Sequence, residues 1–293
     1  MSRLRQFTRD KLQFDVLDAG PLHGTPVVLL HGFPQDATAW SEVTSRLATA
    51  ELRTLAPHLR GYSPGARPTE RSAYRLSVLV GDVVALLDAA GLEKAHLVGH
   101  DWGGGLAWAT AARQPHRVAS LTVLSTPHPA AMAWAARHST QALKSWYMLA
   151  MQLPVLPEVA LRQAVAAGAL KRLGLPPEHA DAYAQRLLQP GALTGAVGWY
   201  RGMLAASPNR PSRMRLKKGS PAAPATRPSS SGDITVPTTY VWGRHDPYLG
   251  RAAALRTARH CTGDYRFVPI EADHWLPEKQ PDLVAREIIA RAH

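Results

Sequence analysis

The chain has 293 residues, of which 45% are hydrophobic, and its formal net charge is +12. This length and composition allow one sizeable core, and no apolar run is long enough to span a bilayer. The single cysteine, Cys261, excludes an internal disulfide, and we expect it to be an inert, packed thiol. Because the charged segment 1–5 also lacks the apolar stretch of a signal peptide, we expect a cytoplasmic protein.

Apolar runs, taken in chain order, predict an α/β protein. Two alternating segments, 4–7 and 12–17, predict an antiparallel hairpin at the edge of a sheet. Helical patterns recur between and after six further apolar runs, which is typical of a parallel sheet with crossover helices. The six predicted strands are 27–30, 53–56, 96–99, 120–124, 238–242 and 266–270. The predicted helices are 40–50, 76–90, 104–113, 251–259 and 282–292.

The hexapeptide 99–104, GHDWGG, lies where a predicted strand ends and a predicted helix begins. Small residues on both sides of a tip residue have the spacing of a nucleophile elbow, in which glycines relieve a strained turn. The tip is Asp101, where an esterase would carry serine. A carboxylate that attacks a saturated carbon forms an ester, and activated water can then cleave that ester. An aspartate at this tip therefore predicts a nucleophile that attacks an alkyl carbon. The alternative is that Asp101 only caps the following helix.

Two later residues match the partners that such a nucleophile needs. Asp246 follows the predicted strand 238–242, and His274 follows the predicted strand 266–270. Catalytic residues collect at such strand ends in open α/β sheets, and nucleophile, acid and histidine is the chain order of this elbow architecture. We predict that His274 is a general base and that Asp246 orients it. Asp273 is a rival for the orienting role, but side chains of adjacent residues point apart.

An oxyanion hole is predicted from the tetrapeptide 31–34, HGFP, which closes the strand 27–30. The main-chain N–H of Phe33 would be one donor and that of Trp102 the other, and both would stabilise charge on the carboxyl oxygen of Asp101. The remaining histidines lack metal-ligand spacing. We therefore expect no metal and no cofactor.

Together, these motifs resemble the α/β-hydrolase-fold epoxide hydrolases over nearly the whole chain, including the segments 60–63 (RGYS) and 274–278 (HWLPE). The resemblance implies a mostly parallel eight-stranded sheet flanked by helices, with an inserted helical cap. It implies a hydrolase core at 1–129 and 234–293 and a cap at 130–206. The intervening segment 207–233 is rich in Pro, Ser and basic residues and predicts a flexible loop.

The resemblance also implies an activity, the hydrolysis of an epoxide to a vicinal diol without a cofactor. Two cap tyrosines, Tyr147 and Tyr200, match the family's positions for activating the epoxide oxygen. The resemblance implies substrate contacts for His31, Pro34 and Trp199. We expect a small apolar epoxide as substrate. A third tyrosine, Tyr183, lies in a polar helix and is expected at the surface.

Three positions depart from the family pattern. His58 stands where an aspartate is frequent, and Gly198 stands where the signature has asparagine. Asp273 replaces a small residue beside His274, and its charge is expected to raise the pKa of the base.

Two other functions stay open. A haloalkane dehalogenase would share Asp101 and Trp102, although Phe33 stands where that family holds halide with asparagine. A catalytically silent, ligand-binding hydrolase fold is the alternative from another class. The dense basic cluster 210–218 has no interleaved aromatic residues on which bases could stack, so we expect no nucleic-acid partner, and we expect no membrane partner.

Overall fold

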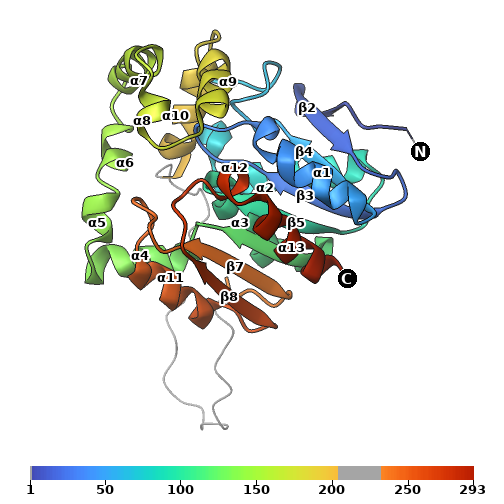
Figure 1. Ribbon diagram of the computed structural model, residues 1–293. Helices are drawn as coiled ribbons and strands as arrows, with labels where there is room; N and C mark the ends of the chain where they lie inside the picture. The colour runs from blue at the N-terminus through green and yellow to red at the C-terminus, as the bar shows by residue number, and fades with distance from the viewer. Residues whose placement is uncertain (1, 204–231) are drawn as a thin grey trace, which may run out of the picture.

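The computed structural model describes residues 2–203 and 232–293 (Figure 1), and in them eight strands form one sheet in the order β1-β2-β4-β3-β5-β6-β7-β8. The first two strands of the sheet, β1 and β2, pair antiparallel, as do β2 and β4, and all later pairs are parallel. The strands are β1 (Gln6–Arg9), β2 (Leu12–Ala19), β3 (Thr25–Leu30), β4 (Leu52–Pro57), β5 (Ala95–His100), β6 (Val118–Leu124), β7 (Thr238–Gly243) and β8 (Tyr265–Ile270). The predicted fold class is confirmed.

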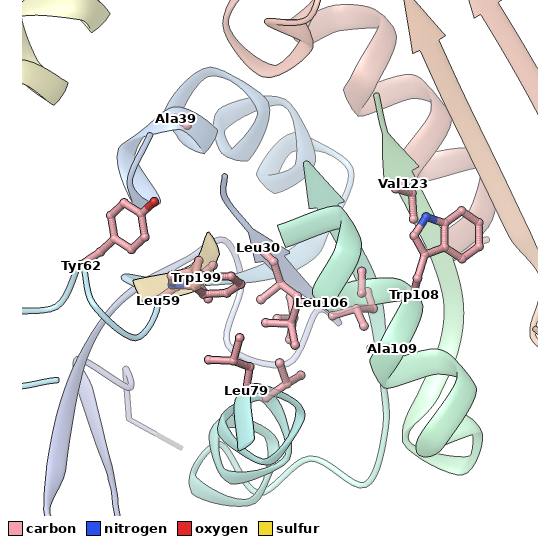
Figure 2. Close-up of a cluster of buried hydrophobic side chains, with 14 of the residues drawn as sticks. Leu30, Ala39, Leu59, Tyr62, Leu79, Leu106, Trp108, Ala109, Val123 and Trp199 are labelled. Atoms are coloured by element: carbon pink, nitrogen blue, oxygen red, sulfur yellow. The ribbon is translucent and has the colours of Figure 1, made fainter. Parts of the chain in front are cut away.

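Helices cover both faces of the sheet, so its central strands are apolar on both sides. In β3, Val28 and Leu30 pack with α2 (Leu76–Ala89) and α3 (Trp102–Arg113) on one face. Figure 2 shows Leu30 in this layer with Leu79 and Leu106. The alternate residues Val27 and Leu29 join a second cluster with α1 (Ser41–Thr49) and α13 (Pro281–Ala292).

Some element ends differ from the sequence prediction. The predicted helix 40–50 is divided into a 3₁₀ turn, Ala37–Trp40, and α1, because the Asp36 carboxylate accepts the Thr38 N–H at 2.7 Å and starts the turn early. The predicted helix 251–259 is likewise divided into α11 (Arg251–Arg256) and a 3₁₀ turn, Thr257–His260. The helix after the elbow begins at Trp102, two residues earlier than predicted.

A helical insertion separates β6 from β7. Figure 1 shows it leaving the sheet at α4, running through α5 and α6, and ending in a group formed by α7 to α10. Its helices are α4 (Pro129–His138), α5 (Gln141–Lys144), α6 (Tyr147–Ala150), α7 (Leu156–Ala166), α8 (Ala169–Arg172), α9 (Pro177–Leu187) and α10 (Ala192–Met203). The short α12 (Leu276–Lys279) precedes α13. No described helix is long and apolar enough to cross a membrane. The predicted loop 207–233 lies, except for its last two residues, outside the described residues.

The turn between β5 and α3 places Asp101 at the carboxyl edge of the sheet. Asp101 has φ 51° and ψ −120°, a backbone conformation that costs energy in a residue with a side chain. The turn packs tightly on the end of β3, because a Cβ on Gly103 would lie 2.1 Å from the Leu30 carbonyl oxygen. Only glycine therefore fits at position 103, and the close crossing fixes the direction in which Asp101 points.

Replacing Gly103 with alanine is expected to lower the free energy of unfolding by about 1–3 kcal/mol, because the added methyl collides with rigid backbone. Gly105, in the same helix, has no atom within 4 Å of an added Cβ. Gly105→Ala is therefore a matched control and should raise stability by about 0.5–1 kcal/mol through reduced unfolded-state entropy. Urea denaturation of both variants measures the difference. Equal stability of the two variants would contradict the close main-chain contact between Gly103 and the Leu30 carbonyl.

Candidate active site

Three side chains meet at the carboxyl edge of the sheet. Asp101 follows β5, Asp246 lies in the loop after β7, and His274 lies in the loop after β8. The Nδ1 atom of His274 lies 2.7 Å from an oxygen of Asp246, and its Nε2 atom lies 3.6 Å from an oxygen of Asp101. An ionised carboxylate only accepts hydrogen bonds, so His274 donates through Nδ1. The structure thus brings together the three residues predicted as nucleophile, base and orienting acid.

Main-chain and buried polar groups hold this arrangement in place. The second carboxylate oxygen of Asp246 accepts the N–H groups of Tyr248 and Leu249 at 2.8 and 2.9 Å. The carbonyl of His274 accepts a hydrogen bond from Nε2 of His100 at 2.8 Å and one from the hydroxyl of Ser125 at 3.0 Å. Both the base and its orienting carboxylate are therefore fixed by atoms outside the pair.

The charges of the three groups are coupled. Burial alone would lower the pKa of His274, but the negative charges of Asp246 and Asp101 outweigh it and raise that pKa to about 10. Burial alone would raise the pKa of Asp101, but the nearby charge of His274 and the hydrogen bond from the Phe33 N–H lower it. Both carboxylates therefore favour the protonated form of His274.

The predicted oxyanion loop lies against the nucleophile. The N–H of Phe33 donates to Oδ1 of Asp101 at 2.9 Å. The hydroxyl of Thr126 donates to the Asp101 carbonyl at 2.8 Å and supports the strained turn. A Cβ on Gly32 would lie 2.3 Å from that of Asp101, so the loop can approach only as glycine. The matching role of the Trp102 N–H stays a prediction.

A cavity of about 210 Å³ opens above Asp101 and is bounded by residues of both the core and the insertion. Its lining is mostly apolar or aromatic and comprises Phe33, Pro34, Asp101, Tyr147, Met151, Leu173, Tyr200, Tyr248, His274 and Trp275. Tyr147 comes from α6, none of whose four residues is fully buried, whereas Tyr200 comes from α10 and is 5% exposed. The two rings lie 6.1 Å apart between centroids.

Both phenols are kept protonated. Burial, together with the nearby Asp101 charge, raises the pKa of Tyr147 and of Tyr200 above the usual value. The Trp102 and Tyr200 rings pack edge-to-face, with 4.8 Å between their centroids. The Tyr200 phenol keeps its proton and lines the cavity above Asp101.

Two residues implied as substrate contacts do not line the cavity. His31 is fully buried; its Nε2 accepts the Leu59 N–H at 3.1 Å, and its Nδ1 donates to the Gly32 carbonyl at 3.0 Å. Trp199 donates from its indole to the Arg60 carbonyl at 2.7 Å, and Figure 2 shows it among core side chains such as Leu30 and Leu59. Both hold main chain in place, while Pro34 does line the cavity.

The departures from the family pattern have local explanations. A Cβ at Gly198 would lie 2.7 Å from the Tyr74 ring, which occupies the space of a side chain there. Asp273 pairs with Lys279 at 2.5 Å and accepts the Trp275 N–H, so its charge is neutralised beside His274. The charges that raise the pKa of His274 most are those of Asp246 and Asp101. His58 is buried, which lowers its pKa.

Sequence reasoning placed Tyr183 wrongly and missed several residues. Tyr183 is 1% exposed, because its hydroxyl donates to Glu278 at 2.9 Å. The same carboxylate accepts from Gln35, which in turn contacts His100 beside the nucleophile. Tyr248, which packs edge-to-face on His274 with 5.1 Å between centroids, was also missed. Its position two residues after Asp246 was the available signal.

Comparison with known proteins assigns the family. The α/β hydrolase fold family matches residues 25–281. A curated relative, Epoxide hydrolase 4 of Homo sapiens, is 32% identical over 94% of this chain and 75% of the human protein. The chain belongs to the epoxide hydrolase family of α/β hydrolases.

Other relatives agree with this assignment. AB hydrolase superfamily protein YfhM of Bacillus subtilis (strain 168) is 34% identical over 94% of this chain and 92% of the relative. The crystal structure of Epoxide Hydrolase A from Mycobacterium thermoresistibile superposes with a TM-score of 0.80 at 26% identity, covering 98% of this chain and 97% of that one. The family predicted from the motifs is therefore confirmed, and the chain is a hydrolase enzyme.

The raised pKa of His274 predicts how stability depends on pH. Below its usual pKa of 6.5 the imidazole is protonated in both folded and unfolded chains, so the stabilisation is complete. As pH rises toward about 10 the unfolded chain loses this proton while the folded chain keeps it, so the free energy of unfolding falls.

Asp246→Asn removes the largest charge that raises this pKa, so the decline between pH 6.5 and about 10 should be shallower in the variant. Urea denaturation at several pH values measures both slopes, and the ¹⁵N chemical shifts of the His274 ring report its protonation directly. A neutral His274 ring at pH 8 in the unmodified enzyme would refute the coupled-charge arrangement.

Proposed function

We propose that this enzyme hydrolyses small apolar epoxides to vicinal diols through an ester on Asp101. The observation that carries the proposal is the position of Asp101 on a cavity that is also lined by the phenols of Tyr147 and Tyr200 and by His274. A carboxylate nucleophile and proton donors in one apolar cavity suit the opening of a strained ring whose oxygen leaves as an alkoxide. The names and titles of the relatives support the same substrate class.

In the first step, a carboxylate oxygen of Asp101 attacks an epoxide carbon and the carbon–oxygen bond of the ring breaks. The departing oxygen is held by Tyr147 and Tyr200 and takes a proton from one of them. The imidazolium of His274 is the proton source that restores the phenol. The step converts carboxylate, epoxide and imidazolium into a hydroxyalkyl ester and a neutral imidazole, so that charge balances.

Ester formation prepares the second step. Once Asp101 is an ester it has lost one of the two negative charges that raise the pKa of His274, so the pKa of the imidazole falls. Neutral His274, held by Asp246, then removes a proton from water, and the hydroxide attacks the ester carbonyl. The Phe33 N–H stabilises the oxyanion, the diol leaves, and carboxylate and imidazolium return.

The insertion acts in this proposal as a cap at 130–206. It supplies Tyr147, Met151, Leu173 and Tyr200 to the cavity, while the core supplies Asp101 and the base. The dehalogenase alternative is less well supported, because the Phe33 side chain offers no donor to a halide. Halide displacement also has no use for the two phenols, Tyr147 and Tyr200, that line the cavity.

A single turnover in oxygen-18 water tests the ester directly. With enzyme in excess over a styrene-oxide-like epoxide, we expect unlabelled diol and one labelled oxygen in the Asp101 peptide, both read by mass spectrometry. Diol that takes its oxygen from water would refute the nucleophile. Absence of turnover, together with halide release from bromoalkanes, would favour the dehalogenase.

The two phenols should act on the first step. Tyr147→Phe and Tyr200→Phe are each expected to slow ester formation by about 10²-fold, because a proton donor is lost from the transition state. Tyr265→Phe is the matched control: the Tyr265 hydroxyl, on β8, has no hydrogen-bond partner among the described residues and does not line the cavity. Stopped-flow quenching of tryptophan fluorescence measures the rate. Equal rates in all three variants would contradict the assigned roles.

A further inference from the structure

The insertion exposes an unusual concentration of large apolar side chains. Within the described residues, every large hydrophobic side chain more than 60% exposed belongs to one segment of fourteen residues. These side chains, here called the apolar edge, are Leu143 (74%), Trp146 (67%), Leu149 (71%), Val155 (68%) and Leu156 (64%). They lie on α5, on α6 and at the start of α7, which Figure 1 shows in succession along one side of the molecule. Contiguous exposed apolar surface marks an interaction site.

Val155 gives an independent sign that this edge has a partner. Its φ is 63° and its ψ is −45°, a positive-φ conformation outside the αL region that a β-branched residue rarely adopts. The chain thus holds a strained apolar side chain in water at the edge, where glycine would be less strained. Strain kept at an exposed position points to function.

A groove connects the apolar edge to the active site. A cavity of about 300 Å³ between α6 and α7 is lined by apolar side chains alone, among them Leu153, Leu156 and Leu161. Met151 lines this groove and also the cavity above Asp101. A surface that covered the edge would therefore lie next to the catalytic cavity.

The charges around the edge select an anionic partner. Arg71, Lys144 and Arg162 donate only to main-chain carbonyls, of Gln152, Asp246 and Leu188 respectively, and none is within ion-pair distance of a carboxylate among the described residues. The single carboxylate of the segment 141–172 is Glu158, and Arg201 binds both of its oxygens, at 2.5 and 2.9 Å. The rim is therefore cationic.

We infer that the apolar edge docks onto an anionic lipid surface. Acyl chains would accept Trp146 and its apolar neighbours, while phosphate headgroups would neutralise the rim cations. A symmetric pairing of two copies of this chain would instead place like charges of the rim near each other. Surface docking needs no spanning helix, so the inference revises the expectation of no membrane partner. It stands without the proposed function, but an apolar epoxide dissolved in the bilayer would then enter beside Met151.

Vesicle co-sedimentation of the full chain tests the inference. We expect binding to vesicles of phosphatidylcholine mixed with phosphatidylglycerol, weak binding to phosphatidylcholine alone, and a decrease as salt is raised. The double variant Trp146→Ser/Leu149→Ser should bind at least about tenfold more weakly. Leu255→Ser, which changes an exposed leucine outside the insertion, should bind as the unmodified chain does.

Two further variants keep the test independent of folding and of catalysis. Val155→Gly removes an apolar side chain and suits the positive φ, so it should fold at least as stably and still bind vesicles more weakly. Lys144→Gln/Arg162→Gln should lose binding and much of its salt dependence. The inference is refuted if the chain does not bind vesicles that contain phosphatidylglycerol, or if the double variant Trp146→Ser/Leu149→Ser binds them as strongly as the unmodified chain. It is also refuted if sedimentation velocity shows that the unmodified chain is a dimer that does not bind vesicles, and that the double variant is a monomer. None of these readouts requires epoxide turnover.

Discussion

The active site depends on a main-chain crossing that leaves no room for side chains. The turn after β5 and the loop after β3 touch through Gly32, Gly103 and the Leu30 carbonyl, at distances that a single Cβ would prevent. This contact is what brings the Phe33 N–H within 2.9 Å of the Asp101 carboxylate. The strained φ of Asp101 follows from the same crossing, and the Thr126 hydroxyl helps to hold it. Packing between two short main-chain segments thus fixes the position of the carboxylate on which the proposed chemistry relies.

The second constraint is electrostatic. The buried His274 ring lies between two carboxylates, and each carboxylate is also bound by main-chain donors: Phe33 for Asp101, and Tyr248 and Leu249 for Asp246. In the proposed reaction the site contains all the protons it needs, since the proton given to the epoxide oxygen is recovered from the attacking water. The site returns to the same charge after each turnover, and no cofactor or external acid is required.

Sequence patterns predicted the parts of this molecule that local chemistry determines. The six predicted parallel strands and the elbow at Asp101 were all recognisable, because apolar runs and the spacing of glycines carry that information in a few residues. Tyr183 was misplaced because its helix is polar in sequence, whereas its burial comes from Glu278, which lies 95 positions later. Leu173 could not be assigned to the cavity, since only tertiary packing brings it there. The exposure of Trp146 was equally hidden, because an apolar run reads the same whether it is buried or in contact with water.

Tyr147 and Tyr200 belong to helices that differ in how deeply they are buried. Tyr200 belongs to α10, which is buried and carries Trp199 bonded to the core at Arg60. Tyr147 belongs to a four-residue helix with no fully buried residue, and the adjacent Met151 forms part of the cavity wall. Substitutions around Tyr147 therefore disturb little packing and cost the fold little. One wall of the catalytic chamber can change its shape over evolutionary time while the opposite wall is preserved by the requirements of folding, so new substrate preferences can arise without loss of the catalytic machinery.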